Sequence, residues 1–374
     1  GLKAARWHRR AAEWIGHNDV TQAIRHWQRV LALTAALPES EDRTGLRLGA
    51  CSFVLMQGGW RLGLSGEEME ALFLEGRALA ERAGDNDARL VLIIGYAARL
   101  GVAGDVRRYD ALSREAHALV DESTSPAVHG NTLVNRAYSS FCLGRIDEAL
   151  RLTAQMPDVL AGDLNLGLDL AGVSLLAESW RGRAEHFGNR GRLDDARACQ
   201  REAERLARAG DVGEALLWIR QTPALIGSMA GERDERVFEE LRRGAFEALE
   251  LAEQIGSWFS QVHSHLWVGG AHALHGEWDA AVRACETAVQ MSKQHQTALE
   301  LEPQILSQQA ETRLGAGDLR AAQAAAEEGI RLARERGQLY FEALNHLARA
   351  RTLRRARGAD ARDEIERALD RALE

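Results

Sequence analysis

The chain has 374 residues, 45% of them apolar and 27% charged, which is enough apolar surface for a packed interior and excludes a disordered chain. Only five residues are proline, while Ala, Leu, Arg and Glu dominate, so helix is favoured over strand and the expected class is all-α. The formal net charge of −8 excludes a general nucleic-acid binder, because neutralising phosphates requires a basic face.

The cysteines and the apolar stretches argue against a redox centre and a membrane span. Four cysteines lie far apart with no paired spacing, and we expect them to be reduced core thiols: Cys51, Cys142, Cys199 and Cys285. The longest apolar stretch starts at residue 90 and meets Arg99 well before the ~20 residues that a membrane helix needs. Without a signal peptide at its start, the chain is expected to be cytoplasmic.

A short phrase recurs along the chain: a glycine, a turn with an acidic residue, and an alanine five positions after the glycine. Weaker copies lie near Gly16, Gly66, Gly104 and Gly231. The clear copies occupy residues 144–149, 191–196, 276–281 and 317–322. Steps of roughly 40 to 50 residues therefore tile the chain without a linker.

Each position of the phrase has a physical role. The glycine ends one helix in a left-handed backbone conformation, and the aspartate that follows caps the next helix. The alanine is small because two helices cross there at close range. Apolar-periodic stretches flank each glycine and predict one antiparallel helix pair per repeat. Since stacked pairs bury their apolar stripes, we expect one α-solenoid over residues 1–374, with about eight to nine helix pairs in a right-handed superhelix.

Two copies of the phrase resemble the tetratricopeptide repeat, because small or apolar residues stand where that repeat requires them. In one copy these are Val268, Gly269, Ala281 and Ala288, and in the other Trp180, Ala184, Phe187, Ala196 and Ala203. The step exceeds the ~34 residues of the standard repeat, which implies longer helices. Arg183 and Ser140 occupy positions that the pattern keeps apolar.

Five further segments narrow the resemblance by their order and spacing: 7–14, 23–31, 71–82, 103–106 and 361–369. Their succession resembles the C-terminal repeat region of bacterial class III adenylate/guanylate cyclases that carry an AAA-type ATPase module. The resemblance implies a parent that makes a cyclic nucleotide and a repeat region that acts as its regulatory, partner-binding arm. The helical sensor regions of ATP-dependent transcription activators, which would bind a small effector, are the alternative.

The sequence contains no catalytic motif of such a parent. A phosphate loop needs a lysine preceded by a glycine array and followed by Ser or Thr, whereas Lys293 is followed by Gln294. The paired aspartates of a two-metal cyclase site, on adjacent strands, are also missing. We therefore expect a non-catalytic scaffold with no cofactor.

Histidines and tryptophans offer alternatives to a plain repeat. Four histidines lie near one predicted helix: His263, His265, His272 and His275. His272 and His275 have a spacing that suits a shared metal ion, but His265 lies about 10 Å away along the axis, so structural histidines are favoured over a metal enzyme. Tryptophans at helix-packing positions are expected in the core: Trp7, Trp14, Trp27 and Trp180.

The second and sixth positions of each first helix face the predicted concave surface. They select Arg9, Gln57, Asn131, Asn135, His263, Trp267, Gln304 and Gln308 as a peptide-binding groove. Asn131 and Asn135 resemble the carboxylate clamp of peptide-binding repeats, although the lysines of that clamp are missing. A solvated polar groove is the alternative. The glycines after Gln57 indicate an irregular helix junction rather than a phosphate loop.

The expected partner is a protein or peptide, and the cyclase and ATPase modules of the same polypeptide are candidates. Neither nucleic acid nor a membrane is an expected partner.

Overall fold

The computed structural model describes residues 1–16, 19–230 and 235–373, and these ranges are helical almost throughout. The first part of the array contains α1 (Leu2–Ile15), α2 (Val20–Thr34), α3 (Glu41–Phe53), the π-helix η1 (Val54–Gly58), α4 (Gly59–Arg61), α5 (Gly66–Ala83), α6 (Asn86–Val102) and α7 (Val106–Ala118). The middle contains α8 (Pro126–Cys142), α9 (Ile146–Val159), α10 (Leu168–Ala171), α11 (Leu175–Asn189), α12 (Leu193–Ala209) and α13 (Ala215–Ala230).

The last part contains α14 (Glu235–Ile255), α15 (Trp258–Leu274), α16 (Trp278–His295), η2 (Leu299–Leu301), α17 (Glu302–Gly315), α18 (Leu319–Arg336), α19 (Leu339–Arg357), η3 (Gly358–Ala361) and α20 (Arg362–Leu373). Within the described ranges, extended pairing is limited to an isolated bridge between Val173 and Gly213. The all-α class is confirmed, and so is the α-solenoid of tetratricopeptide-like helix pairs in a right-handed superhelix. No helix among the described residues is long and apolar enough to cross a bilayer.

The repeated glycine ends helices as its sequence context predicts. Gly104, Gly144, Gly191, Gly276 and Gly317 separate paired helices and have φ between 70° and 90°. The alanines of the four clear copies are fully buried where the helices cross: Ala149, Ala196, Ala281 and Ala322. Of the weaker copies, Gly66 opens α5 instead of ending a helix, and the turn at Gly231 lies outside the described residues.

The predicted aspartate cap holds in only part of the array. Asp105 and Asp318 accept hydrogen bonds from the backbone N–H groups of Arg108 and Ala321 at the starts of α7 and α18. In the copies that begin at Gly144 and Gly191, arginine occupies the cap position, and the acidic residues lie in the first helical turn. There they stabilise the helix through its dipole rather than through a cap hydrogen bond.

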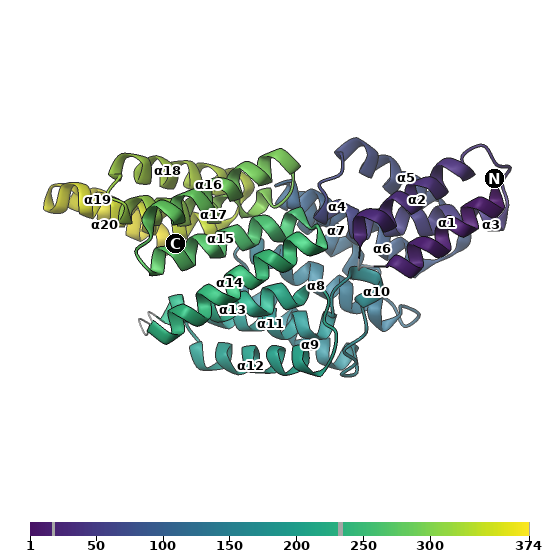
Figure 1. Cartoon of the computed structure of the whole chain (residues 1–374), viewed down its shortest axis with the longest axis horizontal. Helices are drawn as coiled ribbons and strands as arrows, with labels where there is room; N and C mark the ends of the chain where they lie inside the picture. The colour runs from purple at the N-terminus through teal and green to yellow at the C-terminus, as the bar shows by residue number, and fades with distance from the viewer. Residues whose placement is uncertain (17–18, 231–234, 374) are drawn as a thin grey trace.

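Consecutive helices pack in antiparallel order, and the array winds so that its early and late helices meet (Figure 1). The purple N-terminal helices and the yellow C-terminal helices occupy opposite ends of the view, with the teal helices α9 to α12 below. In the centre, α15 lies beside α4, and η2 contacts α6. The molecule is therefore closed across its middle.

We call the contacts of Trp60, Arg61 and Gly63 with residues 214–218, 259 and 295–297 the seam. Arg61 Nε donates to Glu214 Oε2 at 2.5 Å, and Arg61 Nη2 donates to the Ala171 carbonyl at 2.7 Å. Both charged side chains are essentially buried, with 1% and 2% of their surface exposed. Thr297 Oγ1 also donates to the carbonyl of Trp60 at 2.6 Å. The seam is thus polar and sterically specific.

At Gly63 the two segments of the seam approach each other closely. The φ of Gly63 is +60°, and an added Cβ would lie 1.7 Å from the backbone oxygen of His295. Any side chain at this position would be strained by the backbone conformation and would push the two segments apart.

Two tryptophans contradict the expected core. Trp7 and Trp14 on α1 are 61% and 87% exposed, whereas Trp27 is 4% exposed. Helix α1 lies at the N-terminal end of the array and packs against α2 and α3 (Figure 1), and these contacts leave the two indole rings in solvent. The cysteines are buried and free, as expected.

We expect Glu214→Ala to lower the free energy of unfolding by about 3–5 kcal/mol, because Arg61 would remain buried without its partner. The measurement is urea unfolding followed by circular dichroism. Glu366→Ala removes an exposed pair with Arg362 and is the control, for which we expect a midpoint near that of the native protein. Equal midpoints for the two variants would contradict a structural role of the seam pair.

Candidate functional site

The concave interior of the superhelix contains a cavity of about 170 Å³. Its walls come from early, middle and late helices alike: η1, α4, α6, α7, α8, α9, α10, α11, α13, α15, η2 and α17. The seam forms part of this wall, since Trp60, Trp218 and Phe259 line the cavity. A ligand in the cavity would therefore contact both sides of the seam at once.

Aromatic rings make up much of the wall. The Trp60 and Phe259 ring centroids are 5.3 Å apart in an edge-to-face arrangement, and Trp218 lies 6.2 Å from Trp60. The Arg61 guanidinium stacks 4.0 Å from the Trp60 ring centroid. Tyr138 and Phe141 of α8 line another part of the cavity. Such a wall binds apolar, ring-shaped or cationic groups.

A charged triad on α11 supplies the polar part of the site. Arg181 donates two hydrogen bonds to Glu178, at 2.7 and 2.8 Å, and a third to Glu185 at 2.8 Å. Burial alone would raise the pKa of Glu185, but the attraction of Arg181 outweighs it and the pKa is lowered. The three residues lie on one helical face because their spacing is i, i+3 and i+7.

Two histidines beside this triad are neutral near pH 7. Burial lowers the pKa of both His186 and His263 to about 4, against the attraction of Glu185. Trp267 Nε1 donates to His263 Nε2 at 3.3 Å, which assigns the ring proton to Nδ1. Nδ1 of each histidine is buried without a hydrogen-bond partner.

Helix α8 contributes two amides to the cavity. Asn135 Nδ2 donates to Asn131 Oδ1 at 2.9 Å, and Tyr109 donates its hydroxyl proton to Asn135 Oδ1 at 3.1 Å. The Nδ2 group of Asn131 has no partner, although the residue is only 2% exposed. A buried donor without an acceptor is costly, so Asn131 is poised to donate to a ligand.

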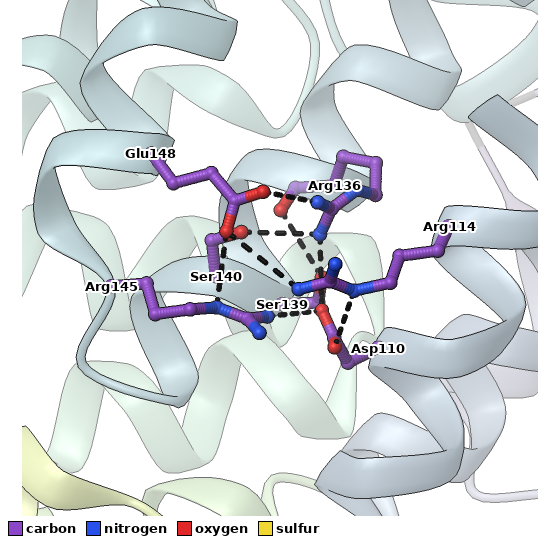
Figure 2. A network of polar contacts seen from close by, with 7 residues as sticks. All are labelled: Asp110, Arg114, Arg136, Ser139, Ser140, Arg145 and Glu148. Carbon is purple, nitrogen blue, oxygen red and sulfur yellow. Dashed lines mark hydrogen bonds and ion pairs between the residues drawn. The ribbon is translucent and has the colours of Figure 1, made fainter. Parts of the chain in front are cut away.

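An ion network holds α8 from another face (Figure 2). Asp110 of α7 accepts hydrogen bonds from Arg114, Arg136 and Arg145, the first two at 3.0 Å. Glu148 of α9 accepts from Arg136 as well. Burial opposes ionisation of Asp110, yet the bonds from Arg114 and Arg145 hold its pKa below the usual value. The network ties α7, α8 and α9 together and fixes the helix that carries Asn131.

The network also explains one departure from the repeat pattern. Ser140, at a position expected to be apolar, accepts a hydrogen bond from Arg136 at 3.2 Å.

Four of the eight groove residues predicted from the sequence line the cavity together: Asn131, Asn135, His263 and Gln304. Trp267 supports His263 from outside the lining, one turn along α15. Gln308 lies one turn beyond Gln304, partly exposed and outside the lining.

Gln57 and Arg9 were placed wrongly by the repeat register. Gln57 is fully buried and donates to the Leu170 carbonyl at 2.5 Å, so its amide serves the fold. It lies in η1, where the wider π-helical turn rotates the following side chains away from their α-helical positions. Arg9 pairs with Glu13 on the exposed surface of α1, at the end of the array. The irregular junction expected after Gln57 is confirmed by η1 and the short α4.

The sequence reasoning missed Glu178, Arg181 and Glu185 as cavity residues. The signal was present, because these charges share the helical face of the apolar Leu175. A charged triad on an otherwise buried face indicates a polar site inside the protein.

His272, near the end of α15, and His275, just after it, do not line the cavity. His272 Nδ1 is 2.5 Å from Glu277, and His275 lies 3.9 Å from Glu239. In the described chain, Glu235, Glu239 and His275 form one group whose possible ligand atoms lie within 4.8 Å of one another. Both glutamates are exposed, and exposed acidic groups commonly cluster without a metal ion.

Comparisons with known proteins relate the chain to helical-repeat structures. A Rap protein complexed with competence and sporulation factor superposes with a TM-score of 0.64 at 12% identity, over 100% of this chain and 96% of that one. NprR in complex with its cognate peptide NprX superposes with a TM-score of 0.56 at 11% identity, over 87% of this chain and 90% of that one. The Cut9–Hcn1 structure superposes with a TM-score of 0.55 at 15% identity, over 95% of this chain and 60% of that one.

These likenesses show a shared tetratricopeptide-like fold. No protein-family model and no curated protein matches the sequence.

The pH dependence of stability contains a separable contribution from Glu300. Burial raises its pKa to about 7, against the hydrogen bond from Tyr138 at 3.0 Å and the attraction of Arg336. The folded protein therefore keeps a proton that the unfolded chain releases near pH 4.5. This contribution to stability is complete below that pH and is lost as the pH rises through 7.

We expect Glu300→Gln, which cannot ionise, to gain about 2–3 kcal/mol of stability relative to the native protein between pH 5 and pH 8, at ~1.4 kcal/mol per pKa unit. The measurement is urea unfolding of both proteins across this range. His186 and His263 titrate in the opposite sense, but they are present in both proteins and cancel in the difference. Parallel stability curves would contradict the assignment.

Proposed function

We propose that this chain is a ligand-responsive regulatory domain, in which occupancy of the central cavity changes the closure of the superhelix and thereby its affinity for a protein partner. The observation that carries the proposal is that the two sides of the seam supply the same cavity wall. A ligand that contacts Trp60 and Phe259 together has a higher affinity for the closed arrangement, and differential affinity is what shifts a conformational equilibrium.

The structural likenesses support this proposal. The Rap protein is described as complexed with competence and sporulation factor, and NprR with its cognate peptide. We extend to this chain only the binding of an effector, and we propose the central cavity as its place here. We also propose that residues 1–374 act as a single array of about eight to nine helix pairs, since the seam joins its early and late helices.

The finer proposal is that the array is the non-catalytic, autoregulatory arm of a cytoplasmic nucleotide cyclase with an AAA-type ATPase module. It is supported by the order of the five sequence segments that resemble such proteins. In this case the partner is the cyclase or ATPase module of the same polypeptide.

The second candidate is the effector-sensing region of an ATP-dependent transcription activator. The cavity volume favours a small effector, because an engineered cavity of ~150 Å³ holds a benzene ring. An extended peptide would need a wider opening of the groove. Both candidates share the responsive superhelix and differ in the module that it regulates.

The seam can be tested with two glycine variants. We expect Gly63→Ala to open the superhelix, because its Cβ would clash with the backbone of His295. Gly191→Ala is the matched control, since Gly191 has a similar φ of +70° but open space around its Cβ position. Small-angle scattering should give a larger radius of gyration for Gly63→Ala alone. Equal radii for the two variants would exclude closure through the seam.

The partner is tested by calorimetric titration of the chain with the separately produced cyclase and ATPase modules. We expect saturable binding whose affinity changes at least ~10-fold in Gly63→Ala. In Gly191→Ala, which introduces only the strain of a left-handed backbone, we expect the affinity to stay close to that of the native chain. Absence of binding at high micromolar concentration would reject the intramolecular partner. Unchanged affinity in Gly63→Ala would reject the coupling between closure and partner binding.

A further inference from the structure

We propose that the cavity binds an organic ammonium group carried on an aromatic or branched apolar body, with the ammonium against Glu185 of the α11 triad. The inference rests on the proposed function in one respect, that the cavity receives a ligand. The charge of the lining, its aromatic wall, its unpartnered polar atoms and its size all favour such a ligand.

The charge of the lining is unbalanced. Arg181 is the single cation of the α11 triad and is shared by Glu178 and Glu185, so one negative charge remains. The neighbouring histidines do not neutralise it, because burial lowers the pKa of His186 and His263 to about 4. Arg61, the other guanidinium near the wall, is already paired with Glu214. A net charge inside a protein is costly until an opposite charge joins it.

The aromatic wall suits a cation as well. Trp60 already has the Arg61 guanidinium 4.0 Å from its ring centroid, and Arg181 lies 5.9 Å from the Trp218 ring centroid. Rings attract ammonium groups through their quadrupole, and the attraction is stronger where water is excluded. The same wall provides apolar contact for the body of the ligand.

Unpartnered polar atoms on two buried side chains point to a bound molecule. Asn131 is 2% exposed, and its Nδ2 group has no acceptor; His186 is 4% exposed, and its Nδ1 atom is also without a partner. Both residues line the cavity. Asn131 donates, so the ligand is expected to carry an oxygen acceptor in addition to its cation.

The volume of about 170 Å³ limits the ligand to a ring with a short arm, given that ~150 Å³ holds benzene. Two sources carry this chemistry: a free arylalkylamine, and the N-terminal residue of a peptide, whose ammonium and first carbonyl match Glu185 and Asn131.

The test is calorimetric titration of the full chain with 2-phenylethylamine and with its neutral isostere 2-phenylethanol. We expect the amine to bind at least ~10-fold more tightly than the alcohol. Glu185→Gln should reduce the amine affinity to that of the alcohol and leave the alcohol unchanged, because glutamine keeps an acceptor for Arg181 but lacks the charge. Thermal melting of the variant checks that it remains folded.

Helix α18 offers a matched control. Glu328, Arg331 and Glu335 repeat the same spacing and the same hydrogen bonds on the exposed surface. Glu335→Gln should leave the affinity for the amine unchanged. Loss of amine binding in both variants would indicate a general charge effect and would overturn the site.

Titration with the peptide amide Phe-Gly-Gly-NH₂ and with its N-acetylated form distinguishes a peptide N-terminus from a free arylalkylamine as the ligand. Tighter binding of the free peptide than of 2-phenylethylamine, abolished by acetylation, identifies a peptide N-terminus. Weaker binding of the peptide identifies a free amine.

Equal affinity of the native chain for amine and alcohol would overturn the cation inference and leave the ligand-responsive function standing. The absence of any binding up to 10 mM, about the limit of useful fragment affinity, would also overturn it. The proposed function is judged separately by the glycine variants, which use no ligand.

Discussion

The Arg61–Glu214 ion pair joins segments 153 residues apart, and the closed form of the array depends on it. In most repeat proteins each repeat contacts only its neighbours, so shape follows from the sum of small rotations between repeats. Here a buried charge pair adds a long-range constraint. Its hydrogen bonds to Gln57, Ser260 and a backbone carbonyl leave little freedom to slide, unlike an apolar contact.

The same constraint gives the interior its chemical character. Because early and late helices meet, the concave surface becomes a cavity with an aromatic wall, a charged triad and unpartnered polar atoms on Asn131, His186 and His263. The ion network around Asp110 holds α8 in place through Arg136 and Ser139, which do not line the cavity (Figure 2). The site therefore combines the helix α8, held by the ion network, with a wall that belongs to the seam, so a ligand would contact both.

Local features of the fold were predictable from the sequence, and long-range ones were not. Gly144 predicts a helix end because its backbone conformation is a local property. Ala149 predicts a close helix crossing because the size of its side chain is also a local property. The pairing of Arg61 with Glu214 has no local signature. Trp7 and Trp14 were assigned to the core because helical periodicity identifies an apolar face but does not say whether another helix covers it.

The candidate site was predicted in part for the same reason. Asn131, Asn135, His263 and Gln304 were found because they share one register in regular repeats. Gln57 failed because η1 breaks the register, and a π-helical turn cannot be recognised from residue types alone. Glu185 was missed because its role depends on the curvature of the array, which brings α11 toward α13 and α15.

A seam between distant segments also restricts how this protein can change over evolution. Solenoids ordinarily lengthen or shorten by gain or loss of whole repeats, since each new unit only extends the stack. Between α4 and α13, one added helix pair would advance the superhelix by a full step and carry Glu214 away from Arg61. The repeat number in this interval is therefore tied to the geometry of the closed form. Helix α19 is tied as well, because the Tyr340 hydroxyl donates to Asn189 Oδ1 of α11 at 2.9 Å.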